Sequence, residues 1–223
     1  MYLKMEHIVK EIKKNLILDD ISLELEAGKI YGLQGKNGSG KTMMIKGMCG
    51  LIRPTKGSVW VNEERLGDAR DFPESVGALI ENPGFINGYS AYRNLKVLAD
   101  MRQKITDERI LATLEEVGLA DVGKKKFRHF SLGMKQKLGI AAAIMEEPEL
   151  ILLDEPGNAL DEKSVENLRN ILFKQKERGA LIVIASHDAE ELSILADTIF
   201  VMENGKIVRS YQPHEDNGER GAK

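Results

Sequence analysis

The sequence predicts an α/β fold: a buried parallel sheet, an antiparallel β subdomain at the N-terminus and an inserted α-helical subdomain. Three observations predict it. A short apolar segment at 29–33 leads into a glycine-rich loop and then an apolar helix. Two later runs, 150–153 and 181–185, are apolar enough to be buried on both faces of a parallel sheet. Between these parts, 85–147 shows the three-to-four-residue apolar spacing of helices.

The N-terminal half reads mainly as strands. They are expected at 17–25, 29–33, 58–61 and 76–80, separated by Gly28 and by the turn at 53–57. Residues 1–10 alternate charged and apolar side chains, without the long apolar stretch or cleavage site of a signal peptide. No window approaches the roughly 18 apolar residues that cross a bilayer, so another chain would span any membrane involved.

The middle and the C-terminal third are predicted in the same way. Helices are expected at 91–101, 107–117 and 131–145, with Asp107 and Ser131 as caps, and at 161–178, where Gly179 ends the helix. A short helix at 188–196, a strand at 198–202, a turn at 203–205 and a final strand complete the domain. We expect one domain over 1–210, with its core and β subdomain at 1–84 and 148–210, its helical subdomain at 85–147, and a flexible polar tail at 211–223.

Composition narrows the class of protein. The chain has 223 residues, 30% of them charged and 5% aromatic, which is enough to bury a substantial core under a well-solvated surface. Its net charge of −3 provides no general attraction to nucleic acid. The single cysteine, Cys49, excludes an internal disulfide and fits a reducing compartment.

The glycine-rich loop predicts a nucleoside triphosphate site. Glycines allow a sharp turn that brings consecutive N–H groups against phosphate oxygens at the positive end of the following helix. Lys41 adds a mobile positive charge, and the Thr42 hydroxyl is a ligand for Mg²⁺. The alternative is a glycine-rich turn with one solvated lysine. The loop consists of Gly35, Lys36, Asn37, Gly38, Ser39, Gly40, Lys41 and Thr42.

Two further segments end at the same predicted sheet edge. Asp154 and Glu155 follow a buried strand, where Asp154 could hold Mg²⁺ and Glu155 could polarise the attacking water; the alternative is an acidic turn. His187 follows the strand at 181–186 and could hydrogen-bond the terminal phosphate, although an isolated histidine is usually structural. Ser131 caps a helix whose free N–H groups attract an anion, unless it is an ordinary cap.

The order of these segments resembles the ATP-binding subunits of ABC transporters, over roughly 1–210. These are P-loop NTPases with a RecA-like parallel core. Residues 35–42 are similar to their Walker A motif, 150–155 to Walker B and 186–188 to the switch-histidine loop. Residues 130–136 are similar to their signature motif, and 158–161 lie where their D-loop lies.

The resemblance implies a mechanism and partners. Two such domains, as a homodimer or heterodimer, face each other head to tail, so that each ATP is sandwiched between the Walker A loop of one chain and Ser131 with Gly133 of the other. ATP and Mg²⁺ close the pair, hydrolysis reopens it, and a transmembrane permease is driven. The subunit would be cytoplasmic and peripheral on the inner face of the membrane, with no nucleic-acid partner.

Several residues depart from the family pattern. Glu81 replaces the usual glutamine after a strand; it could still offer an oxygen to Mg²⁺, but its charge adds a bare repulsion of about 4 kcal/mol per charge pair at ~4 Å and a dielectric of ~20. Leu132 and Met134 replace glycine and glutamine in the signature motif. Ile12 falls where an aromatic residue normally stacks on adenine, and Met43 where a second hydroxyl often reaches the α-phosphate.

Residues 81–85 and 130–136 look most like the branch that serves bacitracin-type and lantibiotic-type peptide export and self-protection. Two other functions remain open: a soluble ABC-type ATP switch acting on DNA or ribosomes, and a regulatory module that binds ATP but hardly hydrolyses it. The family also implies that a permease helix docks near 84–94, where Phe85, Ile86, Tyr89 and Tyr92 could equally belong to the core of the helical subdomain.

Overall fold

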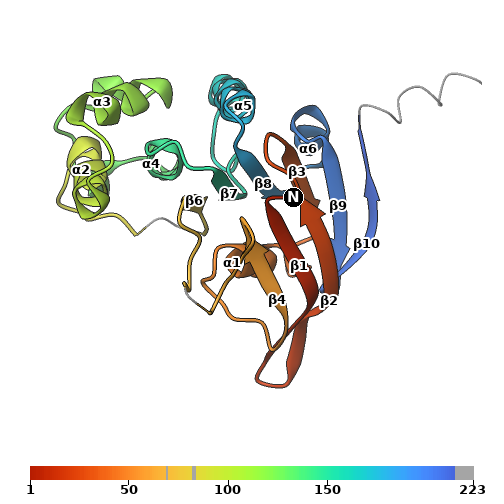
Figure 1. Cartoon of the computed structure of the whole chain (residues 1–223). Helices are drawn as coiled ribbons and strands as arrows, with labels where there is room; N and C mark the ends of the chain where they lie inside the picture. The colour runs from red at the N-terminus through yellow and green to blue at the C-terminus, as the bar shows by residue number, and fades with distance from the viewer. Residues whose placement is uncertain (69, 82–83, 214–223) are drawn as a thin grey trace, which may run out of the picture.

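The computed structural model describes residues 1–68, 70–81 and 84–213. These residues form an antiparallel sheet with strand order β2-β1-β4-β5 and a second sheet with order β10-β9-β3-β8-β7-β6 (Figure 1). Strands β9, β3, β8, β7 and β6 pair in parallel, and only the edge strand β10 is antiparallel. The predicted α/β class with a parallel core is confirmed.

The elements follow one another along the chain as the sequence patterns suggest. The strands are β1 (Leu3–Ile12), β2 (Asn15–Leu25), β3 (Ile30–Gln34), β4 (Lys56–Val61), β5 (Glu64–Arg65), β6 (Val76–Leu79), β7 (Leu150–Asp154), β8 (Leu181–Ser186), β9 (Thr198–Glu203) and β10 (Lys206–Tyr211). The helices are α1 (Lys41–Met48), α2 (Ala91–Arg102), α3 (Asp107–Glu116), α4 (Leu132–Ile144), α5 (Glu162–Glu177) and α6 (Ala189–Leu195), with short 3₁₀ turns at Ala120–Val122 and Phe127–His129.

The parallel sheet separates two apolar cores. Every residue of β7 and β8 is buried, which confirms that these strands are covered on both faces. Alternate residues face opposite cores: Ile151 and Leu153 pack with the helices α2–α6, whereas Leu150 and Leu152 pack with α1 and the antiparallel sheet. Helix α1 is therefore enclosed between the two sheets, which fixes the helix that follows the glycine-rich loop (Figure 1).

Some local predictions were wrong. Strand β1 was not predicted, although residues 1–10 alternate charged and apolar side chains; its pairing with β2 is irregular between Met5 and Ile8, where His7 has a positive φ of 49°. Helix α3 is capped by Thr106 rather than Asp107, which instead lies in the first turn and pairs with Lys96. Strand β10 includes Tyr211, whose hydroxyl donates to Gln34 Oε1 at 3.0 Å, so regular structure extends one residue past the predicted end at 210.

Of the predicted tail at 211–223, residues 214–223 lie outside the described residues. Within the described ranges, no helix is both long enough and apolar enough to cross a bilayer.

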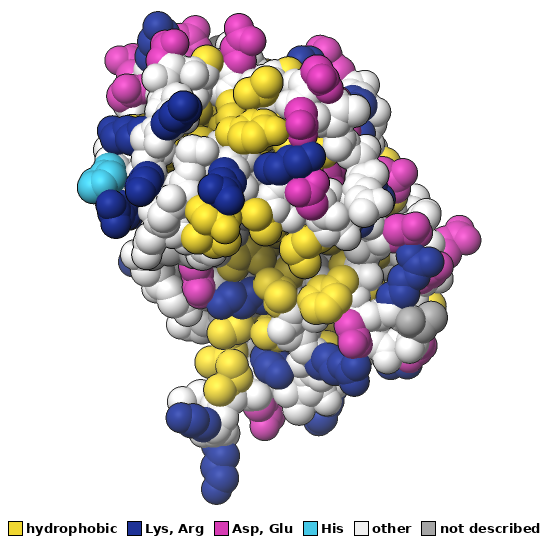
Figure 2. Space-filling model, turned by 90° about the vertical axis from the view of Figure 1, so that its left-hand side faces the viewer, with side chains coloured by type: hydrophobic (Ala, Val, Ile, Leu, Met, Phe, Trp, Pro, Cys, Tyr) yellow, Lys and Arg dark blue, Asp and Glu magenta, His cyan; other side chains and the backbone are white. Residues whose placement is uncertain are grey.

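The helices α2, α3 and α4 lie between β6 and β7 in the chain and to one side of the sheets (Figure 1). Figure 2, which faces this side, shows hydrophobic side chains gathered around a hollow. Exposed apolar residues on or next to α2 are Ile86, Val97, Leu98 and Met101. By contrast, Phe85 and Tyr92 pack against the helical core, so this segment contributes both to the core and to the surface.

Candidate functional site

The loop between β3 and α1 has a backbone that its glycines make possible. Gly38 and Gly40 have φ values of 83° and 107°, which side-chain-bearing residues rarely adopt. A Cβ on Gly35 would lie 2.6 Å from the carbonyl oxygen of Met202, so a larger residue would not fit there. Gly40 precedes α1, whose N-terminal N–H groups receive no side-chain cap from the described residues. They are free to bind an anion.

Lys41 points into this loop. Its side chain is buried, and Nζ donates to the carbonyl oxygens of Gly35 at 2.6 Å and Lys36 at 3.3 Å. The same nitrogen lies 3.7 Å from Glu155 Oε1. One ammonium group therefore connects the loop with the end of β7. Alongside it, a cavity of 860 Å³ is lined by residues 34–39 of the loop, by His187 and by residues of β9 and the turn after it.

Thr42 and Asp154 form the second feature. The Thr42 hydroxyl donates to Asp154 Oδ2 at 2.6 Å, across the gap between α1 and the end of β7. Burial raises the pKa of Asp154, the Thr42 hydrogen bond opposes this rise, and the nearby Glu155 carboxylate adds to it. A cation at this point would relieve the cost of a buried negative charge.

The donor atoms here fit Mg²⁺. Hydroxyl and carboxylate oxygens are the ligands of a hard cation, which commonly takes one or two protein carboxylates and completes its shell with phosphate and water. The described residues contain no cluster of three or more His, Cys, Asp or Glu side chains that could hold a metal by themselves. Two buried oxygens, Ser39 Oγ and Glu155 Oε1, have no hydrogen-bond partner among the described residues.

Glu155 and His187 lie together at the ends of β7 and β8. Glu155 has a φ of 49°, and its N–H donates to the Ala185 carbonyl at 2.8 Å. Its Oε2 lies 2.9 Å from His187 Nδ1 and accepts from Ser186 Oγ at 3.4 Å. The pairing of β7 with β8 therefore brings a carboxylate and an imidazole, far apart in sequence, to one edge beside the glycine-rich loop.

Glu81 follows β6, the next strand along the same sheet edge. Its Oε1 lies 2.6 Å from Lys46 Nζ on α1, and its φ is 55°. From the sequence, no protein counterion was predicted for the Glu81 carboxylate. In the structure, Lys46 supplies one. A signal was present in the sequence, because Lys46 follows Thr42 by four residues and so shares its helix face.

Ser131 and Gly133 lie at the start of α4. Ser131 Oγ accepts from Met134 N–H at 3.2 Å, which confirms the predicted cap. In the described part of the chain, the hydrogen bonds of Ser131 stay within α4, so the chain does not itself bring this residue to its own glycine-rich loop. Gly133 passes close to the loop after β7, where a Cβ would lie 2.7 Å from the Ala159 carbonyl. Leu132, between them, is exposed.

The sequence predicted no individual role for Gln136. Its Nε2 donates to the carbonyl oxygens of Glu155 at 3.0 Å and Pro156 at 3.1 Å. It therefore ties α4 to the backbone that carries the Glu155 side chain. No local pattern predicts this contact, because it joins two separate elements.

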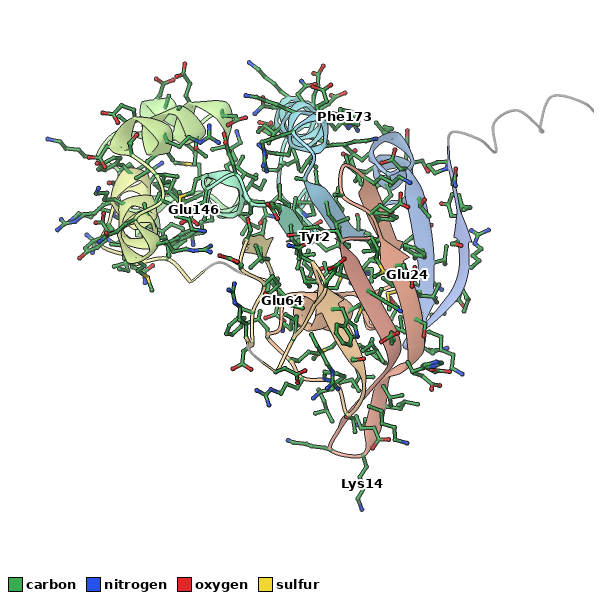
Figure 3. All side chains as sticks on the ribbon, in the orientation of Figure 1. Tyr2, Lys14, Glu24, Glu64, Glu146 and Phe173 are labelled. Atoms are coloured by element: carbon green, nitrogen blue, oxygen red, sulfur yellow. The ribbon has the colours of Figure 1, made fainter. Side chains whose placement is uncertain are left out.

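Ile12 and Met43 differ in their surroundings. Met43 is partly buried and packs against the core around α1. Ile12 is 36% exposed at the end of β1, opposite Asn15 in the hairpin whose tip carries Lys14 (Figure 3). Farther along β2, the Ile17 carbonyl and Leu18 lie close to Gly40. The hairpin therefore lies beside the edge of the glycine-rich loop.

Comparisons with known proteins identify the family of this chain. The ABC transporter family matches residues 18–158. The chain is 46% identical to an uncharacterized ABC transporter ATP-binding protein, YybJ of Bacillus subtilis (strain 168), over 92% of this chain and 94% of that protein. It is 42% identical to the bacitracin transport ATP-binding protein BcrA of Enterococcus faecalis, over 91% of this chain and 67% of BcrA. It is 39% identical to the lantibiotic transport ATP-binding protein SrtF of Streptococcus pyogenes, over 92% of this chain and 89% of SrtF.

Solved structures show the same fold. The structure of an ATP-binding subunit of an ABC transporter superposes with a TM-score of 0.88 at 26% identity, covering 100% of this chain and 95% of the other. A bacterial ABC transporter cassette solved as a dimer gives a TM-score of 0.86 at 22% identity. From the family match and these relatives, the chain belongs to the ABC transporter family and is an ATP-binding subunit of such a transporter.

Proposed function

We propose that this subunit hydrolyses Mg-ATP and that its turnover powers a separate membrane permease. The observation that carries the proposal is the arrangement of Glu155 and His187 at adjacent strand ends, 2.9 Å apart, beside the glycine-rich loop. A carboxylate positioned by an imidazole is suited to accept a proton from an attacking water. Glu155 Oε1, buried and without a hydrogen-bond partner among the described residues, is the oxygen that would do so.

The other side chains bind and orient the nucleotide. Lys41 and the N–H groups of 38–42 would bind the phosphates, while the side chains of 35–37 shape the loop and Ser39 offers its hydroxyl. Thr42 and Asp154, with Glu81 nearby, would hold Mg²⁺, which when bound neutralises charge that develops on the phosphoryl group. His187 would hold Glu155 in place and reach the terminal phosphate. Met43 would lie near the α-phosphate, and Ile12 would lie near the adenine base.

Two chains would complete each site. Ser131 and Gly133, at the start of α4, would contact the nucleotide held by the loop of the facing chain, as in the head-to-tail pairs of the family. The cap geometry supports this proposal, because α4 presents backbone N–H groups next to an exposed Ser131. The partner could be a second copy or a related ATP-binding subunit.

The permease would bind the side that carries α2. The exposed Ile86, Val97 and Met101 lie on or next to α2, and Figure 2 shows hydrophobic side chains around a hollow on this side. BcrA and SrtF are named for bacitracin and lantibiotic transport, which supports antimicrobial peptides as the transported class. Through its permease the subunit would lie on the inner face of the membrane.

A substitution of Glu155 tests the hydrolytic role. Glu155→Gln keeps the shape of the side chain and removes its basicity, so we expect ATP binding to persist while turnover falls by ~10²-fold or more. Phosphate release at millimolar Mg-ATP measures turnover, and a fluorescent nucleotide measures binding. Glu203→Gln, which alters an exposed carboxylate lining the cavity beside the same loop, is the matched control and should keep full turnover. Unchanged hydrolysis in Glu155→Gln would exclude Glu155 as the base.

A further inference from the structure

We infer that Lys46 is a positioning residue that holds the Glu81 carboxylate against α1 and competes with the metal for it. Lys46 thereby sets the Mg²⁺ concentration at which nucleotide binds. The inference rests on the metal site of the proposed function and extends it to a residue outside the nucleotide-binding motifs.

The geometry begins with α1. Thr42 and Lys46 are four residues apart and share one face of this helix. The Thr42 hydroxyl donates to Asp154 at the end of β7, and the Lys46 ammonium lies 2.6 Å from Glu81 after β6. Strands β6 and β7 are paired in parallel, with Leu79 opposite Leu153. Two donors one helical turn apart therefore hold two carboxylates from neighbouring strand ends.

The charges around Glu81 explain why it needs a counterion. Asp154 and Glu155 are the neighbouring carboxyl groups, and the Glu81 carboxylate is close enough to contribute to the raised pKa of Asp154. Lys41 is engaged with the loop carbonyls and pairs with Glu155, while Lys46 forms the ion pair with Glu81 among the described residues. A glutamine at this position would carry no charge and would bind an ammonium group less strongly than a carboxylate does.

The environment of the pair makes it more than a fluctuating surface contact. The Lys46 side chain is only 21% exposed, so its ammonium group is partly shielded from water, whereas Glu81 is 64% exposed. Glu81 also has a φ of 55°, a conformation that residues with side chains seldom adopt, and Lys46 is the contact that anchors its carboxylate. Because a carboxylate oxygen can serve either an ammonium group or a hard cation, Lys46 and Mg²⁺ are competitors for Glu81.

A double-mutant cycle tests this competition by binding rather than by activity. Binding of a fluorescent, non-hydrolysable ATP analogue is followed as Mg²⁺ is raised, in wild type, Lys46→Met, Glu81→Gln and the double variant. We expect Lys46→Met to lower the half-saturating Mg²⁺ concentration by about fivefold, within the range of couplings between contacting residues. In the Glu81→Gln background, Lys46→Met should change the half-saturating Mg²⁺ concentration by less than about twofold. The ion pair is already absent there, so only the long-range effect of removing one positive charge remains.

Lys46→Arg is the conservative control: it keeps the charge and the ion pair and should stay within about twofold of wild type. Thermal unfolding verifies that every variant is folded. An equal shift from Lys46→Met in both backgrounds, or a rise in the Mg²⁺ requirement, would overturn the inference while leaving the proposed function intact. Wild-type nucleotide binding that does not respond to Mg²⁺ would instead contradict the metal site itself.

Discussion

At the scale of single residues, Ile12 distinguishes this chain from the family pattern. The side chain is aliphatic and partly exposed at the end of a hairpin whose second strand passes beside Gly40. An aliphatic group offers the adenine ring apolar contact but no π-face on which to stack. In the proposed site, Ile12 would therefore hold the base more weakly than an aromatic residue would.

Ile12→Tyr should tighten ATP binding. Stacking of a base on an aromatic side chain is worth about 1–3 kcal/mol, so the Kd should fall by about tenfold. Titration calorimetry with ATP in the Glu155→Gln background measures this without interference from hydrolysis. Val208→Tyr, at an exposed position on β10, controls for a general effect of an added aromatic ring and should leave the Kd unchanged. A Kd that does not respond to Ile12→Tyr would remove Ile12 from the base site.

Glu81 illustrates how a single residue depends on its neighbours. Considered alone, its carboxylate adds a repulsion of about 4 kcal/mol toward a nearby negative group at an effective dielectric of ~20. The 2.6 Å contact with Lys46 supplies the opposite charge, so the chain carries its own compensation before any metal binds. The glutamate and the lysine are therefore best understood as one unit.

At the scale of elements, α4 connects two parts of the site. Its first turn carries Ser131 and Gly133, and its second turn carries Gln136, which donates to the backbone of Glu155 and Pro156. A displacement of α4 would therefore be transmitted to the backbone that carries Glu155. In the proposed pair of chains, Ser131 and Gly133 would contact the partner's nucleotide, and α4 connects them to Glu155, the proposed proton acceptor of their own site.

Gln136→Met should weaken this connection. It removes two hydrogen bonds while keeping the length of the side chain, so we expect the free energy of unfolding to fall by about 1–2 kcal/mol and turnover to fall several-fold. Denaturant unfolding and phosphate release measure the two effects. Asn167→Leu is the matched control, because Asn167 donates a similar amide–carbonyl bond to Glu116, from α5 to the last residue of α3. It removes one hydrogen bond rather than two, so it should lower the free energy of unfolding by about half as much without changing turnover. A loss of turnover in proportion to the lost stability would show that Gln136 acts only through stability.

At the scale of the whole molecule, one chain contains only part of the proposed site. The glycine-rich loop, Thr42, Asp154, Glu155 and His187 meet at one sheet edge, while among the described residues the hydrogen bonds of Ser131 remain within α4. A second chain, facing the first, is the physical way to place both sets of groups on one nucleotide. We therefore expect the oligomeric state of the protein to change when ATP binds.

Ser131→Asp should prevent that change. Aspartate is as good a helix cap as serine, so α4 is kept, but its carboxylate would face the phosphates across the interface. In the Glu155→Gln background, light scattering should show an ATP-dependent dimer, and adding Ser131→Asp should leave a monomer that still binds ATP. Ser90→Asp makes the same exchange at the cap of α2 and should preserve the dimer. A dimer that survives Ser131→Asp would contradict the head-to-tail arrangement.

The features that the sequence predicts correctly are held by local interactions. The strand–loop–helix around Lys41, the buried strands β7 and β8, and the cap at Ser131 depend on periodicity, glycine spacing and side-chain–backbone bonds between near neighbours. These were predicted correctly. Strand β1 was missed although its residues alternate, because its place in the sheet depends on pairing with β2 and β4 in a register that shifts near His7, and no local pattern shows this pairing.

By itself, the sequence determined the class of fold, the glycine-rich loop and the identity of the polar groups that end each buried strand, because these are properties of short segments. Only the tertiary structure decided which groups meet. Lys46 and Glu81 are 35 residues apart, and Gln136 reaches a carbonyl 19 residues away, through the pairing of strands and the packing of α1 and α4 against the sheet. Contacts of this kind depend on how distant segments pack together, and no local pattern encodes them.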